Sequence, residues 1–264
     1  MYLLDNKYYI IRIGDFATNG NKKILYSLFS ICLCLEEYIS VKSIDCFSIM
    51  IGSTIVWTII EYILSFTKTR VIKPMYVTNY SGKKIKLNKH LGIFLQGFQE
   101  GGVVTTFGLY FGDRLFNVKY LIFFHLFIGY IVINMVMKDN NNLNIKNVKQ
   151  IKKNKNISKR QINTIPSLGI MGYITIYNVK TLYYNQSHFL RQFKMFFVMI
   201  YVCSIWSLIA YYKEFRKVKI YEKNENDQYI SKNINYSDTI FILGYDVIFE
   251  IGIAYLTFYN WFIL

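Results

Sequence analysis

Carboxylate and amide side chains inside long apolar stretches are the residues of this chain with the clearest capacity for chemistry. Glu100 lies in the middle of one such stretch, and Asp246 and Glu250 lie in another. A carboxylate at the centre of a membrane-spanning helix opposes insertion by roughly 2.5 to 3.5 kcal/mol, so it must face protein or water rather than lipid. The residues that we assign to a polar interior on this ground are Glu61, Gln96, Gln99, Glu100, Asp246 and Glu250.

Helical spacing predicts that these side chains share faces. Gln96 and Glu100 are four residues apart, as are Asp246 and Glu250, and Glu61 follows a polar face that begins at Thr54. Crowded carboxylates can exchange protons or coordinate a hard cation through oxygen ligands. The pattern therefore predicts a proton or small-cation path through a bundle of helices, each of which turns one polar side to a common interior.

Two other interpretations of the same acids stay open. The chain could be a membrane-embedded enzyme that modifies lipid, with Glu100 or Asp246 as the general acid or base. It could also be a structural or assembly protein in which each acid bonds a neighbouring helix. Whether the chain is an enzyme is therefore undecided at this stage, and no cofactor is indicated.

Histidine usage bears on metal chemistry. The three histidines are His90, His125 and His188, and they do not form a closely spaced pair of the kind found in zinc or di-iron motifs. His125 lies inside an apolar stretch and could join the acids as a metal ligand. A single histidine in such a place is more often hydrogen-bonded within the helix bundle, so no metal site is assigned.

Four glycines predict close helix packing. They form two small-xxx-small pairs in the stretch that carries Glu100, namely Gly97 with Gly101 and Gly108 with Gly112. Small residues let helix backbones approach each other, which supplies much of the packing energy between helices in lipid. We expect this helix to be central to the bundle.

Composition and hydropathy place these residues in a membrane protein. Hydrophobic residues make up 53% of the 264 residues and charged residues 18%, and the apolar residues are gathered in long blocks. Because about 20 apolar residues cross a bilayer, the blocks predict a single all-α polytopic transmembrane bundle over residues 1–264. The six predicted spans are 24–38, 46–66, 91–110, 119–137, 194–212 and 239–264, while 166–177 is predicted to be an interfacial or re-entrant segment.

Charge in the connecting segments predicts orientation and partners. Segments 67–90 and 138–165 each carry a net charge of +7, which favours the cytoplasmic side, whereas 111–118 and 212–238 are nearly neutral and suit the opposite side. Six spans then leave both termini in the cytoplasm. Segment 138–165 contains eight asparagines and is predicted to be disordered; its bases favour contact with anionic lipid. Nucleic-acid binding is not predicted, since aromatic residues are not interleaved with these bases.

One short segment resembles a known family. The string WTIIEYIL at residues 57–64 is similar to a helix of the membrane fatty acid hydroxylase and sterol desaturase superfamily, in which a Trp, Glu and Tyr pattern leads into histidine ligands. The resemblance implies a helical membrane enzyme with a di-iron centre. Ser65 and Phe66 follow here in place of histidine, and the chain has fewer histidines than that centre uses.

Overall fold

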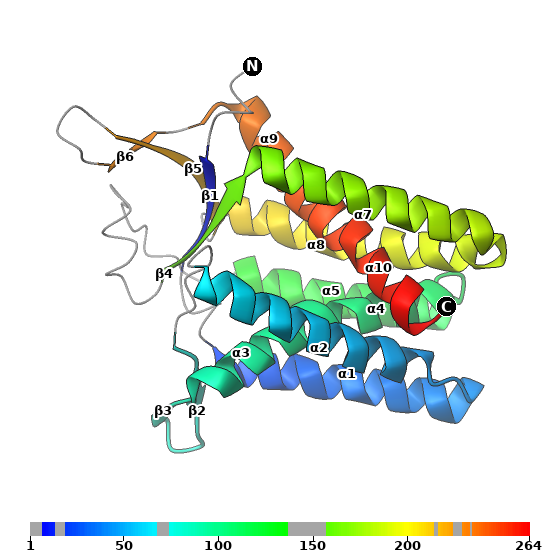
Figure 1. Ribbon diagram of the computed structural model, residues 1–264. Coiled ribbons are helices and arrows are strands. Elements are labelled where there is room, and N and C mark those ends of the chain that lie inside the picture. Colours follow the sequence, from blue (N-terminus) through cyan, green and yellow to red (C-terminus); the bar gives the residue numbers. More distant parts are fainter. Residues whose placement is uncertain are drawn as a thin grey trace.

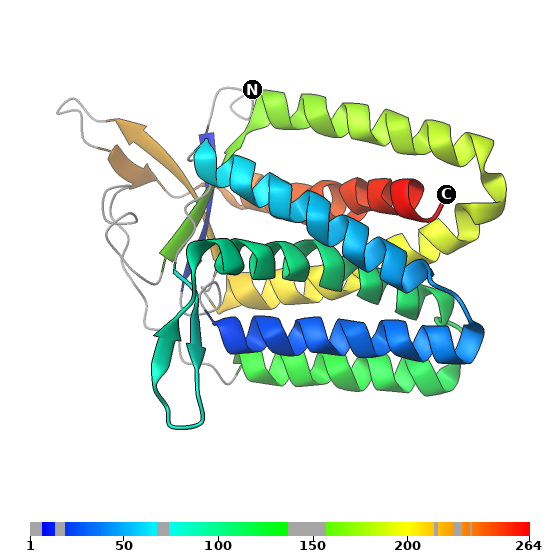
Figure 2. The same ribbon diagram turned by 60° about the horizontal axis from the view of Figure 1, so that its bottom comes forward.

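The computed structural model describes residues 7–13, 19–67, 74–136, 157–213, 216–223, 229–232 and 234–264. Within these residues the chain is mainly helical, and its helices form seven roughly aligned rods (Figures 1 and 2). Five rods are single helices: α1 (Gly20–Val41), α2 (Asp45–Phe66), α5 (Val118–Val136), α7 (Thr164–Tyr184) and α8 (Phe189–Tyr212). Two rods are composite: α3 (Lys89–Gly97) with η2 (Phe98–Val103) and α4 (Val104–Asp113), and α9 (Tyr236–Gly244) with η4 (Tyr245–Ile253) and α10 (Ala254–Phe262).

Length and composition identify membrane-spanning candidates among these helices. Four helical stretches of the described chain are long and apolar enough to cross a membrane: Gly20–Val41, Asp45–Phe66, Gln186–Tyr212 and Tyr236–Phe262. They coincide with the first, second, fifth and sixth predicted spans, although α1 and α8 are longer than predicted. The chain is therefore a helical bundle with the properties of a multi-pass membrane protein.

The first helix extends beyond the predicted span 24–38 at both ends and carries two glutamates, Glu36 and Glu37, in its last two turns. The Glu36 carboxylate accepts hydrogen bonds from the hydroxyls of Tyr110 and Tyr120 at 2.7 and 2.9 Å. The Glu37 carboxylate accepts one from the backbone N–H of Cys46 at 3.1 Å, in the first turn of α2, where helix N–H groups have no partner within the helix. Both acids thus have partners on other helices, with Glu37 buried and Glu36 partly exposed at the end of the bundle, and α1 runs to Val41.

Segment 166–177 is part of a longer helix than its apolar length predicts. It belongs to α7, a continuous helix of 21 residues in which Asn178 is paired with η4 and α10. Asn178 donates to the backbone carbonyl of Ile253 at 2.8 Å, and Asn260 donates to the Asn178 side-chain oxygen at 2.8 Å. Hydropathy underestimates such a helix because it scores buried, hydrogen-bonded amides as if they faced lipid.

A four-stranded antiparallel sheet covers one end of the helices (Figure 1), which an all-α fold does not include. Its strand order is β4-β1-β5-β6, with β1 Lys7–Ile13, β4 Ile157–Asn163, β5 Arg216–Lys223 and β6 Tyr229–Lys232. β1 pairs with both β4 and β5, so these strands come from three segments distant in the sequence. β4 occupies part of the segment predicted to be disordered; residues 138–156 of that segment lie outside the described residues.

The sheet also corrects the predicted relation between two connecting segments. Ile10 is paired with Arg160 on one side and with Val218 on the other, so segments 138–165 and 212–238 meet at the same end of the bundle. They were predicted on opposite sides. The difference arises because α7 adds one further passage along the bundle, and Leu264 accordingly lies at the end away from β1 (Figure 1).

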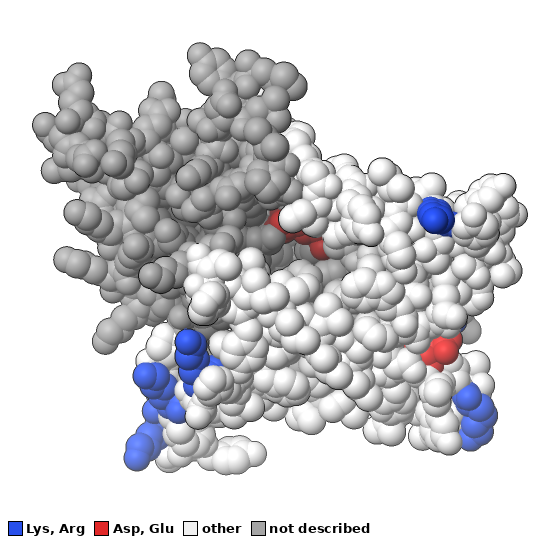
Figure 3. All heavy atoms as spheres, viewed as in Figure 1, with Lys and Arg blue, Asp and Glu red and all other residues white. Residues whose placement is uncertain are grey.

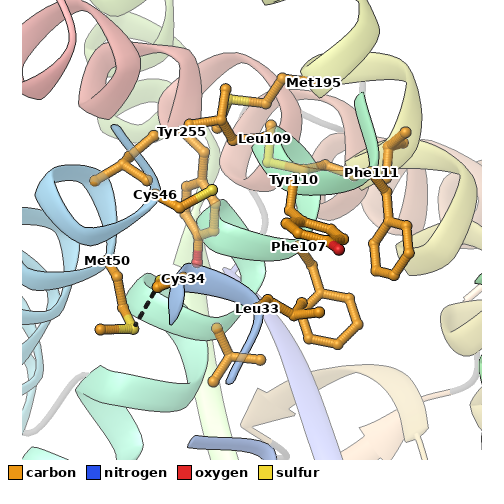
Figure 4. Close-up of a cluster of buried hydrophobic side chains, with 14 of the residues drawn as sticks. Leu33, Cys34, Cys46, Met50, Phe107, Leu109, Tyr110, Phe111, Met195 and Tyr255 are labelled. Carbon is orange, nitrogen blue, oxygen red and sulfur yellow. Dashed lines mark hydrogen bonds between the residues drawn. The ribbon is translucent and has the colours of Figure 1, made fainter. Parts of the chain in front are cut away.

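The hydrophobic core lies between α1, α2, α4, α5, α8 and α10 (Figure 4). Cys34, Cys46 and Met195 are fully buried within it, and the thiol of Cys34 lies 3.7 Å from the sulfur of Met50. α4 is at the centre of this arrangement, since it contacts α1, α2, α5 and α8. These contacts hold the composite rod α3–η2–α4 in place.

A charged network holds the end of the bundle that lies away from the sheet. The guanidinium of Arg191 on α8 donates to both carboxylate oxygens of Asp113 on α4, with Nη2 2.7 Å from Oδ2, and its Nη1 lies 2.5 Å from Asp45 Oδ2 on α2. Arg114 donates to Glu36 of α1 at 3.1 Å. Four helices are thus tied together at this end.

Candidate functional site

A cavity of about 260 Å³ lies inside the helical bundle, in the half nearer the sheet. One part of its wall is polar and includes the carboxylates of Glu100, Asp246 and Glu250. Figure 3 shows acidic side chains at the bottom of a hollow in the middle of the viewed face. The polar residues that line the cavity are Lys22, Lys23, Gln96, Gln99, Glu100, Asn134, Asp246 and Glu250.

Most of the cavity wall is apolar. Side chains of α4, α5 and α8 form most of it, together with Tyr26 of α1, Val103 of η2 and Ile251 of η4, and they include aromatic, branched aliphatic and methionine residues. The residues that contribute are Val103, Val104, Phe107, Phe127, Ile128, Ile131, Val132, Val198, Met199, Val202, Ile205, Trp206 and Ile209. A mainly apolar wall with a small number of polar groups is typical of sites for small organic molecules.

Hydrogen bonds hold the Glu100 carboxylate on both of its oxygens. The indole N–H of Trp57 on α2 donates to Oε2 at 3.1 Å, and the side-chain amide of Gln96 donates to Oε1. Because an ionised carboxylate only accepts hydrogen bonds, two donors from two different helices orient it well. The Glu100 carboxyl group is therefore held in a fixed orientation beside the cavity that it lines.

Lys23 extends this network to α1. Its ammonium group donates to the side-chain oxygens of Gln96 and Gln99, each at 2.6 Å, although the residue is only 3% exposed. The amide of Gln96 therefore connects the positive charge of Lys23 to the negative charge of Glu100. The ammonium group of Lys23 therefore occupies oxygen ligands that a transported cation would need, and it would also repel that cation.

The acids lie on two unusual helical segments. Glu100 belongs to η2, and Asp246 and Glu250 belong to η4; both segments are π-helical, with i→i+5 hydrogen bonds. The hydroxyl of Tyr255 donates to the backbone carbonyl of Glu100 at 2.6 Å and so joins the two rods. Short π-helical segments are rare and are frequently found at functional sites, because they change which way the following side chains point.

The structure brings together five of the six residues assigned to the polar interior. Gln96, Gln99, Glu100, Asp246 and Glu250 line the same cavity. Glu61 is fully buried on α2, but it is not among the residues that line the cavity. The polar face of α2 packs mainly against the rod α3–η2–α4, where Thr54, Trp57 and Thr58 contact glycines.

Glycines make that packing possible. A Cβ at Gly97 would lie 2.8 Å from the Thr58 backbone, and one at Gly101 would lie 2.8 Å from the Cβ of Trp57, so both glycines face α2. Gly108 and Gly112 face α8 instead, where a Cβ at Gly112 would lie 2.9 Å from a backbone nitrogen. The two pairs have different neighbours because η2 interrupts the α-helical phase between them.

His125 does not join the acids. It lies on the exposed side of α5, where its Nδ1 is 2.8 Å from the Leu121 carbonyl and its Nε2 is 3.5 Å from the Tyr201 hydroxyl. Among the residues that the structure describes, no group of three or more His, Cys, Asp or Glu side chains is arranged to hold a metal ion. The described part of the chain thus offers no ligand set for the metal role considered for His125.

The sequence pattern did not indicate three of the residues that complete the site. Lys23 looks like a charged residue flanking a span, Trp57 like one member of a polar face, and Tyr255 like part of an apolar block. One usable signal was available for Trp57, since a buried indole N–H needs an acceptor. The partner of Lys23 lies more than 70 residues away, and only the fold brings the two together.

Comparison of the chain with protein-family models, with curated proteins and with solved structures gives no match. Function must therefore be argued from the site. Its geometry provides an apolar chamber, hydrogen-bond acceptors on one side of it and a buried ammonium beside them.

Proposed function

We propose that all seven rods cross the membrane. α5 and α7 are 19 and 21 residues long, and at 1.5 Å per residue they reach roughly 29 and 32 Å, which matches a hydrocarbon core of about 30 Å. Their outward sides are apolar, with Leu126 and Ile176 each 69% exposed. Side chains of this type on an outer face are suited to lipid.

The sheet end of the bundle faces the cytoplasm in this proposal. Of the 31 lysines and arginines, 25 belong to segments that precede or connect helices at this end, counting the first turn of each helix. The exceptions are Lys42, Arg114, Lys119, Lys180, Arg191 and Lys194. Since positively charged segments are retained in the cytoplasm, seven crossings leave Leu264 on the opposite side.

We further propose that the bundle binds a small amphipathic molecule in its cavity. The observation that carries this proposal is that one cavity has a largely apolar lining that also includes three acidic residues, Glu100, Asp246 and Glu250. An apolar tail would lie against α4, α5 and α8. The polar head would meet the carboxylates.

The chemistry of the polar side favours a head group that donates hydrogen bonds. Carboxylates accept and do not donate, so a hydroxyl or an amine suits Asp246 and Glu250 better than a second carboxylate does. An amine would also gain an ionic contribution. Long-chain alcohols and amines, including lipids with such head groups, are the ligand class that we propose.

Brominated alkyl chains provide a direct test. Trp57 and Trp206 line the cavity, and bromine quenches indole fluorescence at short range. The full-length protein in detergent would be titrated with brominated octadecanol or octadecylamine, with brominated phosphatidylcholine as the comparison. Stronger quenching by the alcohol or amine at equal bromine concentration supports the proposal, and equal quenching by all three refutes it.

Substitutions then test where the head group lies. Glu250→Gln removes one charged acceptor, and the loss of one hydrogen bond to a charged group, about 1.5 to 3 kcal/mol, corresponds to roughly a 10- to 100-fold weaker binding of the amine. Asp238→Asn, a comparable change in the first turn of the same rod and outside the cavity, should leave binding unchanged. Equal affinities for the two variants would contradict the proposed position.

Proton or small-cation transport is a second candidate. It is favoured by the same three carboxylates and by the hydrogen-bonded connection from Lys23 through Gln96 to Glu100. In proteoliposomes it predicts that Glu100→Gln lowers proton or cation flux while folding is retained. Flux that is unaltered by neutralising each acid in turn would eliminate this candidate, and the mainly apolar wall makes it the weaker of the two.

A further inference from the structure

The β2–β3 hairpin is a second candidate site, separate from the cavity. β2 (Tyr76–Thr78) pairs with β3 (Lys84–Lys86), and Figure 2 shows the hairpin extending from the bundle at the end where α1 and α3 begin. Val77 is opposite Ile85 in the register, and the Val77 side chain lies against Gly20 of α1. Because side chains alternate along a strand, Lys84 and Lys86 point to the other face, away from α1.

The hairpin is attached firmly to the bundle. The side chain of Asn21 on α1 donates to the Thr78 carbonyl at 2.8 Å and accepts from the Thr78 N–H at 2.7 Å. In the turn, the side-chain oxygen of Asn79 accepts from the N–H of Lys83 at 2.9 Å. The hairpin therefore presents its lysines in a defined arrangement.

The charge of this element has one sign. Residues 74–99 contain no Asp or Glu, and the lysines of the hairpin and of the adjoining helix start are all exposed. Figure 3 shows basic side chains gathered where the hairpin leaves the bundle. The residues concerned are Lys83, Lys84, Lys86 and Lys89.

The position of the hairpin along the bundle identifies its partner. α3 begins at Lys89, and within its first two turns Leu91 and Phe94 are 46% and 42% exposed. Exposed leucine and phenylalanine on a membrane helix are suited to lipid chains, so the lysines just before them lie at the depth of the head groups. Tyr80, at the tip of the hairpin, is fully exposed and has the amphipathic character typical of that depth.

We propose that the exposed lysines of the β2–β3 hairpin and its turn, Lys83, Lys84 and Lys86, bind the phosphate groups of anionic phospholipids. Each lysine near an anionic surface strengthens binding about fivefold, so three of them contribute on the order of a hundredfold. The proposal does not depend on what the cavity binds.

Native mass spectrometry of the full-length protein tests this proposal. The protein in detergent would be titrated with phosphatidylglycerol and separately with phosphatidylcholine, and the bound lipids counted. The wild type should prefer phosphatidylglycerol, and replacing Lys83, Lys84 and Lys86 together by glutamine should weaken that binding on the order of a hundredfold. Replacing the same three by arginine should retain it.

A matched variant controls for total charge. Lys42, Lys119 and Lys180 are exposed at or near the opposite end of the bundle, and replacing these three by glutamine changes the net charge equally. This control should bind phosphatidylglycerol as the wild type does. The proposal is overturned if the hairpin variant binds as tightly as the control, or if it loses a co-purified acidic protein while its lipid binding is unchanged.

Discussion

Replacing Gly101 by alanine tests the closest helix contact beside the site. The new Cβ would lie 2.8 Å from the Cβ of Trp57 and would also meet the backbone carbonyl of Ser53. Neither neighbour is the end of a flexible side chain, so α2 and η2 must move apart. Insertion of a methyl group into a well-packed interface costs about 1 to 3 kcal/mol.

Gly129→Ala is the matched control. Gly129 lies in α5, and a Cβ built there would meet nothing within 4 Å. Alanine is favoured over glycine inside a helix by about 1 kcal/mol, so this variant should be neutral or slightly more stable. Because the gain in helix propensity is similar at both positions, the two variants should differ by the steric cost alone, about 1 to 3 kcal/mol.

Thermal unfolding of the purified variants in one detergent measures this difference. Gly101→Ala should unfold several degrees below the wild type, and its tryptophan fluorescence should shift because Trp57 is displaced from Glu100. Gly129→Ala should unfold at or above the wild-type temperature. If Gly101→Ala is as stable as Gly129→Ala, the contact between α2 and η2 is not as close as the structure has it.

Three further predictions concern the two ends of the bundle. Arg191→Gln removes the guanidinium that joins α2, α4 and α8, and it should lower the free energy of unfolding by about 2 to 3 kcal/mol, whereas Lys42→Gln at the same end should change it by less than about 0.5 kcal/mol. Lys23→Met should cost about 1 to 3 kcal/mol, because two amide oxygens lose a charged donor, and similar stability of Lys22→Met would show that the effect is not specific. Asn79 begins an Asn-x-Ser sequon in the β2–β3 hairpin, and in a eukaryotic host it should carry no glycan; its glycosylation would reverse the proposed orientation.

The helical bundle was largely predictable from the sequence, and the reason is length. Apolar blocks of about 20 residues, as in 46–66 and 194–212, have few alternatives to helices. α7 was missed because Asn178 and Lys180 interrupt its apolar character, and the pairing of Asn178 with α10 depends on a distant segment. The sheet was missed because its strands are short and pair only after the helices bring three segments to one end.

The candidate site was predictable in part. The cost of placing an acid in lipid singles out Glu100, Asp246 and Glu250 without a structure, and all three line the cavity. The same argument also selects Glu61, which the structure buries away from the cavity wall. Hydropathy indicates that an acid must be kept away from lipid, but it does not indicate which neighbouring helix the acid contacts.

By itself, the sequence determined that this chain forms apolar helices and which polar side chains must be kept from lipid, because both follow from the local cost of exposing groups to hydrocarbon. Only the tertiary structure decided that Lys23 and Trp57 bind the Glu100 cluster, that α7 completes seven rods, and that three of the acids line one mainly apolar cavity. These features depend on contacts between segments far apart in the chain. Such contacts are set by the packing of whole helices, which no local pattern of residues specifies.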